Sequence, residues 1–158
     1  MKQKNLYLLV GAPGSGKSTW VKNRIAQDGG VWCSRDEVRF SLVKENEEYF
    51  SKENDVFAAW IKNINSAIKD VNTKNIYADA THISQKSRNK TLLHLDLKNV
   101  NIIPVVMTTN SDECVRRNKM RTGRECVPVA VIYRMSSRLM NEPVDKDLCW
   151  NYKEIIYV

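Results

Sequence analysis

Short apolar runs alternate with longer amphipathic segments along the chain. Leu6 to Val10 is a continuous apolar run bounded by Gly11, which is typical of a strand buried on both faces of a parallel sheet. Further short apolar runs follow at intervals. Together they predict strands at residues 6–10, 31–33, 75–80, 101–107 and 154–158.

Helices are predicted between these strands. The segment from Glu53 to Val71 gives the clearest pattern, because its apolar residues recur mostly at three- and four-residue spacing. Candidate N-terminal caps are Ser34, Ser84 and either Ser111 or Asp112, and Pro128 suits the first position of a helix. The predicted helices cover residues 17–27, a stretch after 34, 53–71, 85–98, 112–119 and 128–139.

Strands that alternate with helices imply βαβ units. We therefore expect an α/β fold with three layers, α/β/α, around a mostly parallel five-stranded sheet. The length of 158 residues is that of one domain, so residues 1–158 are expected to form a single unit.

Composition excludes several classes of protein. No apolar run approaches the ~18 residues that span a bilayer, and the apolar run after the N-terminus is too short for a signal peptide. The four cysteines are scattered without a CxxC pair, which favours reduced thiols in a cytoplasmic protein over a disulfide framework. The formal net charge of +7 indicates an anionic partner without identifying it.

The segment after the first strand carries the most specific signal. Residues 11–18, G-A-P-G-S-G-K-S, match the phosphate-binding loop pattern G-x-x-x-x-G-K-S/T, between a buried strand and a helix. Glycines let backbone N–H groups turn toward phosphates, and a lysine and a hydroxyl then reach the terminal phosphates and Mg²⁺. The residues expected to bind ATP here are Gly14, Ser15, Gly16, Lys17, Ser18 and Thr19, with Ser18 as the Mg²⁺ ligand.

A phosphate-binding loop does not by itself select an activity. The glycine spacing does not fit a dinucleotide-binding motif, and no guanine-recognition signature N-K-x-D is present. Motors and switch GTPases usually need a longer chain. We therefore predict a small P-loop kinase that uses ATP and Mg²⁺.

The second predicted strand ends in an acidic and basic pair. A carboxylate at the carboxyl edge of a parallel sheet lies in the ligand crevice, and transfer to a hydroxyl needs a group that takes its proton. Asp36 is the candidate for this role, and Arg39, three residues on, is the candidate for holding an anionic part of the acceptor. Alternatively, Asp36 is only a helix-start carboxylate and Arg39 a solvated charge.

The third predicted strand ends at Asp79, which resembles a weak Walker B acid. Asp79 would serve either the water shell of Mg²⁺ or the orientation of Arg39, and the sequence does not separate these roles. Thr81 is a candidate acceptor contact or part of a plain turn. Arg88 is a further candidate for substrate binding, with a surface charge as the alternative.

A run of basic residues follows the fourth predicted strand. Arg117 and Arg121 are expected to share a helical face, where like charges repel unless an anion lies between them. We predict a helical lid at about residues 112–141 that closes on ATP, with Arg121 stabilising the transferred phosphoryl group and a hinge at Thr122-Gly123. A basic solvated helix is the alternative.

These motifs, in order, resemble the phage-type polynucleotide 5′-kinase and its bacterial relatives. The resemblance rests on G-A-P-G-S-G-K-S-T-W, S-R-D-E-V-R, D-A-T-H and R-N-K-M-R, and it runs from Leu6 to about Pro143. It implies that Asp36 is the general base on a 5′-hydroxyl, that Arg39 contacts the phosphate 3′ of the acceptor nucleotide, and that Asp79 supports that arginine. It implies contact of Arg121 with the donor phosphates. D-A-T-H departs from the family pattern by one additional residue and ends in His82.

We therefore predict an ATP-dependent kinase in which Lys17, Asp36 and Arg121 are catalytic. The preferred acceptor is the 5′-hydroxyl of RNA or DNA. The alternatives are a small-molecule kinase of the same fold, acting on a sugar, nucleoside, antibiotic or activated sugar, and a non-catalytic NTP-binding regulatory module.

The positive charge is concentrated in one part of the chain. Residues 81–141 carry 11 basic and 4 acidic side chains, whereas the remainder carries equal numbers of each sign. The whole excess lies in the predicted lid and the helix before it. Because any kinase must neutralise ATP phosphates, this charge is weaker evidence for nucleic acid than Asp36, Arg39 and the lid motif.

Overall fold

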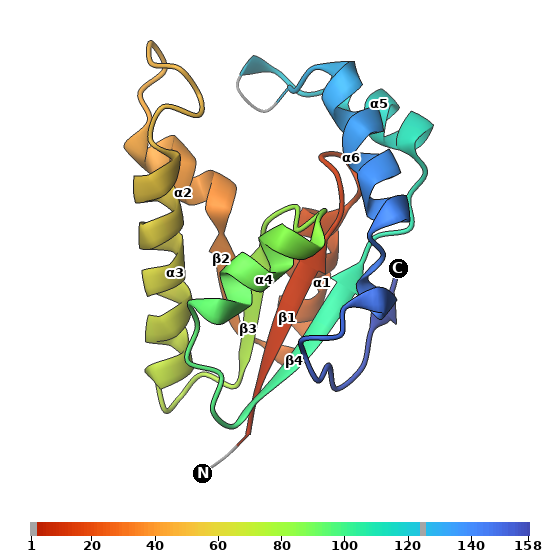
Figure 1. The fold of residues 1–158 in the computed structure, drawn as a ribbon. Coiled ribbons are helices and arrows are strands. Elements are labelled where there is room, and N and C mark those ends of the chain that lie inside the picture. The colour runs from red at the N-terminus through yellow and green to blue at the C-terminus, as the bar shows by residue number, and fades with distance from the viewer. Residues whose placement is uncertain (1–2, 124–125) are drawn as a thin grey trace.

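The computed structural model describes residues 3–123 and 126–158 and contains one five-stranded sheet (Figure 1). All of its strand pairs are parallel, in the order β2-β3-β1-β4-β5. The strands are β1 Lys4–Val10, β2 Val31–Ser34, β3 Asn75–Asp79, β4 Val100–Val106 and β5 Ile156–Tyr157. The predicted α/β fold is confirmed, and the sheet is parallel throughout rather than mostly so.

The helices cover both faces of this sheet. They are α1 Lys17–Asp28, α2 Arg35–Leu42, α3 Glu53–Lys69, α4 Gln85–Leu93, α5 Ser111–Lys119 and α6 Val129–Asn141, with the short 3₁₀ helix η2 Val144–Lys146. Side chains of β1 alternate between the faces: Leu6 and Leu8 pack with α3 and α4, whereas Tyr7 and Leu9 pack with α1. Burial on both faces explains why the strand is apolar at every position from Leu6 onward.

The helix after Ser84 is shorter than predicted. α4 ends at Leu93 instead of about Lys98, because the segment that follows turns toward β4. Asn65 of α3 holds this turn: its amide nitrogen donates to the His94 carbonyl at 3.1 Å, and its oxygen accepts from the Asp96 N–H at 2.9 Å.

Two predicted helix starts shift by one or two residues. Asn110, rather than Ser111 or Asp112, caps α5, since its side chain accepts a hydrogen bond from the Glu113 N–H at 2.9 Å. Pro128 lies just before α6 instead of at its first position. The last strand is also shorter than predicted, because only Ile156 and Tyr157 pair with β4.

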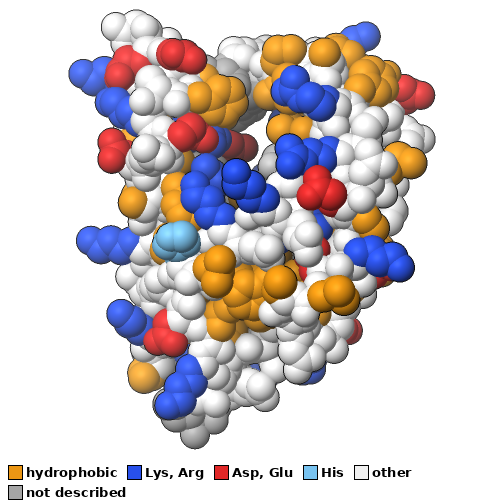
Figure 2. Space-filling view, viewed as in Figure 1, with side chains coloured by type: hydrophobic (Ala, Val, Ile, Leu, Met, Phe, Trp, Pro, Cys, Tyr) orange, Lys and Arg blue, Asp and Glu red, His pale blue; other side chains and the backbone are white. Residues whose placement is uncertain are grey.

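The carboxyl ends of the central strands face an opening between two groups of elements. One group is α2 and the loop of residues 43–52 that joins it to α3; the other is α5 and α6 (Figure 1). Figure 2 shows the surface hollowed between them, with Lys and Arg side chains gathered around the hollow. No helix in the described part of the chain is long and apolar enough to cross a membrane.

Candidate active site

The phosphate-binding loop joins β1 to α1 at the bottom of the hollow. Gly14 and Gly16 have φ angles of 80° and 99°, in the left-handed region that favours glycine. A Cβ atom on Gly14 would also come within 2.6 Å of the Cys114 carbonyl oxygen in α5. The loop backbone therefore needs glycine both for its turn and for its close approach to the lid.

Lys17 begins α1 and points back over the loop. Its ammonium donates to the carbonyl oxygens of Gly11 at 2.9 Å and Ala12 at 3.1 Å. Burial lowers its pKa from the ordinary value, and the negative charges of Asp79 and Asp36 oppose that shift. The charge of Lys17 in the loop therefore interacts with the carboxylates that follow β2 and end β3.

The loop has features that fit a bound nucleotide and metal. The Ser15 hydroxyl is buried and has no hydrogen-bond partner among the described residues, so it is ready to bond an added group. Ser18 and Thr19 follow in the first turn of α1 and are exposed. Within residues 3–123 and 126–158, no group of three His, Cys, Asp or Glu side chains forms a metal cage.

The lid contacts this loop directly. Arg117 of α5 donates to the Gly14 carbonyl at 3.3 Å and to Glu113 at 3.0 Å. Ala12 packs with Cys114, Val115 and Ile132, so α5 and α6 rest on the loop through apolar contacts.

Arg121 is half-buried, and its charge lowers the pKa of Lys17, after burial as the main cause. Arg117 and Arg121 do not share a helical face, because α5 ends at Lys119 before it can reach Arg121. Asn118 holds the chain beyond this end, because its side chain forms two hydrogen bonds with the Val127 backbone, at 2.6 Å and 3.0 Å. The Thr122-Gly123 segment lies in this loop, and Gly123 has a φ of 61°.

Asp36 and Arg39 lie together on the opposite side of the hollow, in α2. Arg39 is 6% exposed, and one of its terminal nitrogens donates to Asp36 Oδ1 at 2.5 Å. The Asp36 side chain remains 66% exposed toward the hollow. The alternative in which Arg39 is a solvated charge is therefore wrong.

Two partners of this pair escaped the sequence analysis. Glu53, in the first turn of α3, accepts two hydrogen bonds from Arg39 at 2.9 Å and 2.6 Å, in bidentate geometry. Tyr49, in the loop 43–52, donates to Asp36 Oδ1 at 3.3 Å and accepts from Arg39 at 3.4 Å. The only sequence signal for Glu53 was an acidic residue at a helix start.

Asp79 ends β3 and is 8% exposed. It accepts a hydrogen bond from the Trp32 indole at 2.9 Å, and burial raises its pKa against the opposing effect of Lys17. The support for Arg39 that the resemblance implies for Asp79 comes in this structure from Asp36 and Glu53. The charges of Asp79 and Lys17 each oppose the effect of burial on the pKa of the other.

The next residues tie the loop to the rest of the fold. The Thr81 carbonyl accepts a hydrogen bond from the Gly11 N–H at 2.9 Å, and the Thr81 side chain is half-buried. His82 is 3% exposed, with ring nitrogens bonded to the Leu9 carbonyl at 2.7 Å and the Thr91 hydroxyl at 2.9 Å. A carbonyl can only accept, so Nδ1 carries the hydrogen, and burial lowers the pKa of His82 to about 3.

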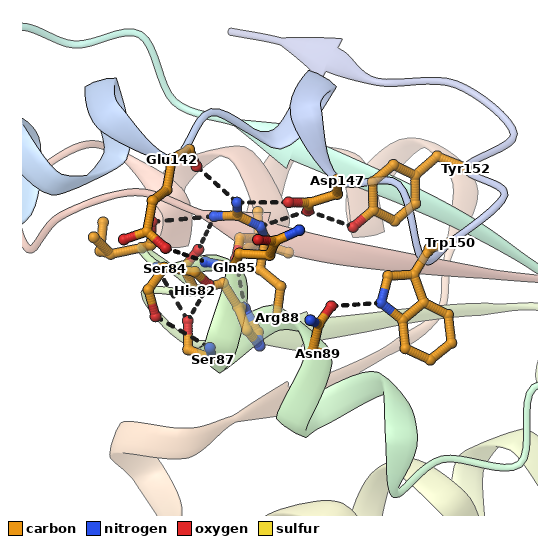
Figure 3. Close-up of polar contacts among 12 residues, drawn as sticks. His82, Ser84, Gln85, Ser87, Arg88, Asn89, Glu142, Asp147, Trp150 and Tyr152 are labelled. Carbon is orange, nitrogen blue, oxygen red and sulfur yellow. Dashed lines mark hydrogen bonds and ion pairs between the residues drawn. The ribbon is translucent and has the colours of Figure 1, made fainter.

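Arg88 requires a correction, because it is neither a surface charge nor a substrate contact here. Its side chain is fully buried and forms a bidentate ion pair with Asp147, at 2.7 Å and 2.9 Å (Figure 3). Its remaining donors bond the carbonyl oxygens of His82, Ile83 and Glu142. Tyr152 bonds the same carboxylate at 2.7 Å. With all donors used, Arg88 joins α4 to the segment after α6.

Solved structures of known proteins share this fold. A chain in a structure of the Pnkp1/Rnl/Hen1 RNA repair complex superposes with a TM-score of 0.76 at 24% identity, over 89% of this chain and 45% of that one. A gluconokinase from Sinorhizobium meliloti 1021 gives 0.58 at 14% identity, over 100% and 83% of the two chains. A fungal RNA kinase gives 0.57 at 10% identity, over 100% and 75%.

The present chain therefore spans less than half of the RNA repair chain that it matches. The fold of these neighbours is that of P-loop kinases, as predicted from the loop motif. The sequence model of the AAA domain family matches residues 6–142, which include the phosphate-binding loop, the Asp36–Arg39 pair and the lid. Because that match covers most of the chain, the protein belongs to the AAA domain family.

Proposed function

We propose that this protein is an ATP-dependent phosphotransferase that transfers the γ-phosphate to a hydroxyl, and that its acceptor is the 5′-hydroxyl of RNA or DNA. The observation that carries the proposal is the placement of Asp36 across the hollow from the phosphate-binding loop. The carboxylate is exposed, is held by Arg39 and Tyr49, and lies within the electrostatic reach of Lys17.

The loop supplies the donor side of the reaction. Backbone N–H groups of residues 14–18 and the Lys17 ammonium would hold the ATP phosphates, and the Ser15 hydroxyl would gain a partner there. Ser18 would ligate Mg²⁺, with Asp79 beside Lys17 to support its water shell. When bound, Mg²⁺ neutralises charge on the phosphates. Arg117 and Arg121 extend the positive surroundings from the lid.

Asp36 supplies the acceptor side. Both of its hydrogen bonds use Oδ1, and among the described residues Oδ2 accepts none. Oδ2 is thus available to accept the proton of the acceptor hydroxyl as its oxygen bonds to the γ-phosphorus and the bond to the ADP oxygen breaks. Arg39 would contact a phosphate of the acceptor, at the cost of loosening its present bonds.

The choice of a polynucleotide rests on the motif order and on the RNA repair and RNA kinase neighbours, whose likeness to this chain is one of fold. Gluconokinase and deoxyadenosine kinase share the fold too, so a small-molecule acceptor is the competing outcome of the test. The second competing outcome is a regulatory module that binds NTP without turnover.

The test is transfer of labelled γ-phosphate from ATP to 5′-hydroxyl oligonucleotides, sugars and nucleosides. Asp36→Asn should reduce transfer by about 10²- to 10⁴-fold while ATP affinity, measured by calorimetry, stays within twofold. Asp55→Asn is the matched control, since Asp55 is an exposed carboxylate in the first turn of α3, and it should keep the wild-type rate. Full activity of Asp36→Asn would refute the assignment of the base. Turnover of a metabolite without labelling of any oligonucleotide would refute the proposal that the acceptor is a 5′-hydroxyl of RNA or DNA.

A further inference from the structure

Three aromatic rings form a cluster beside Asp36 and Arg39, and we call them the aromatic platform: Phe40, Tyr49 and Phe50. The ring centroids of Phe40 and Tyr49 are 6.1 Å apart, and those of Tyr49 and Phe50 are 4.8 Å apart with nearly perpendicular planes. Phe50 is 59% exposed although it is a large apolar side chain. Single exposed apolar residues are ordinary, but rings grouped beside a candidate site point to a ligand.

The platform belongs to the same hydrogen-bonded unit as the candidate base. The Tyr49 hydroxyl donates to Asp36 Oδ1, and Arg39 donates to the Tyr49 hydroxyl. The Arg39 guanidinium also lies 4.9 Å from the ring centroid of Tyr49 and 5.4 Å from that of Phe50. A group that rests on these rings is therefore placed next to both Asp36 and Arg39.

We infer that the aromatic platform stacks a nucleobase of the acceptor strand, within its first two nucleotides, and so makes this protein select acceptors that carry a base. The inference rests on the proposed function and deepens it by naming what the acceptor side recognises. A nucleotide offers a flat aromatic ring and an anionic phosphate a few bonds apart. In the structure, the exposed ring of Phe50 and the half-buried ring of Tyr49 lie 5.4 Å and 4.9 Å from the Arg39 guanidinium.

The chemistry of the platform argues against the sugar alternative. A sugar or sugar acid has no aromatic face, so it could not form a π-stack with Phe50. A base can form this stack, and stacking on an aromatic side chain tolerates any base sequence because every base has a π-face. The platform therefore predicts acceptance of many 5′-terminal sequences.

The test compares intact 5′-hydroxyl oligonucleotides with matched ones that lack the base at the first or the second position. Phe50→Ala should raise the KM for the intact oligonucleotide about 10-fold with little change in kcat. Removal of the stacked base should raise the wild-type KM by a similar factor, and Phe50→Ala should then add nothing further. Phe50→Trp keeps an aromatic ring at this position, so its KM should stay near the wild-type value.

Tyr157→Ala is the matched control, because Tyr157 is 58% exposed on β5, at the opposite edge of the sheet from β2. It should leave the KM unchanged, and thermal unfolding should be alike for all variants. If Phe50→Ala raises the KM equally for intact and baseless oligonucleotides, or not at all, the platform is refuted and the kinase proposal stands. If the wild type labels no oligonucleotide but phosphorylates a sugar, both proposals fail.

Discussion

The two sides of the hollow are built in different ways. The donor side consists of one continuous segment, residues 11–18, whose backbone turns at Gly14 and Gly16, and Arg117 covers it from the lid. The acceptor side consists of side chains from three separate elements, with Arg39 bonded at once to Asp36, Glu53 and Tyr49. Under the proposed function, phosphate recognition would depend on backbone shape, whereas acceptor recognition would depend on a network of side chains outside the loop.

The largest effect that separates the two sides is expected from Lys17→Met. The variant removes the ammonium that lies over the loop and would reach the donor phosphates, so kcat should fall about 10²- to 10³-fold. Initial rates with saturating acceptor measure this loss, and the KM for the acceptor should stay near the wild-type value. Lys22→Met, an exposed site on the same helix, is the control. A large rise in the acceptor KM would show that the two sides are not separable.

A second change should affect both sides together, because it acts on the scaffold between them. The pKa of His82 is lowered to about 3, so between pH 6.5 and 3 the unfolded chain binds a proton that the folded chain does not. The stability contribution of neutral His82 is present above pH 6.5 and is lost as the pH falls. Between pH 7 and pH 5 the free energy of unfolding should decrease by about 2 kcal/mol from this group.

Urea titrations at the two pH values measure that decrease. Asp79, with its raised pKa, acts in the opposite direction, so the contribution of His82 is taken as the difference between the wild type and His82→Gln. His94→Gln, at the exposed histidine, is the control substitution. An unchanged pH dependence in His82→Gln would contradict the buried neutral imidazole.

The smallest effect, confined to the acceptor side, is expected from Glu53→Gln. The amide keeps the shape but removes one of the two charges that hold Arg39, so the acceptor KM should rise about 10-fold with no change in ATP affinity. Glu47→Gln is the matched control, because both glutamate side chains are 30% exposed and ion-paired, Glu47 with Lys52. Equal effects of the two variants would mean that Glu53 has no special part in positioning Arg39.

The same contrast explains what the sequence predicted and what it did not. The phosphate-binding loop is contiguous, so its fixed residues could be recognised at once, and the strand and helix that frame it follow from apolar periodicity. Glu53 and Tyr49 lie 14 and 10 positions from Arg39, and no local sequence pattern predicts that they contact it. The contacts of this network form only when α2 and α3 pack together.

Arg88 illustrates the same limit for charges. It lies in a helix segment that is polar throughout, Q-K-S-R-N-K, and its partner Asp147 is 59 positions away. Sequence periodicity therefore could not distinguish a buried ion pair from a surface charge. The early end of α4 has a related cause, since the side chain of Asn65 holds the backbone that follows the helix.

The fixed end of the lid has a mechanical consequence. Arg88 donates to the carbonyl of Glu142, the residue that follows α6, and also forms the ion pair with Asp147. Arg88 therefore fixes the C-terminal end of α6 to α4. In the proposed closure over a nucleotide, α5 and α6 would move relative to this fixed end, so a buried residue outside the hollow would limit how far Arg121 moves.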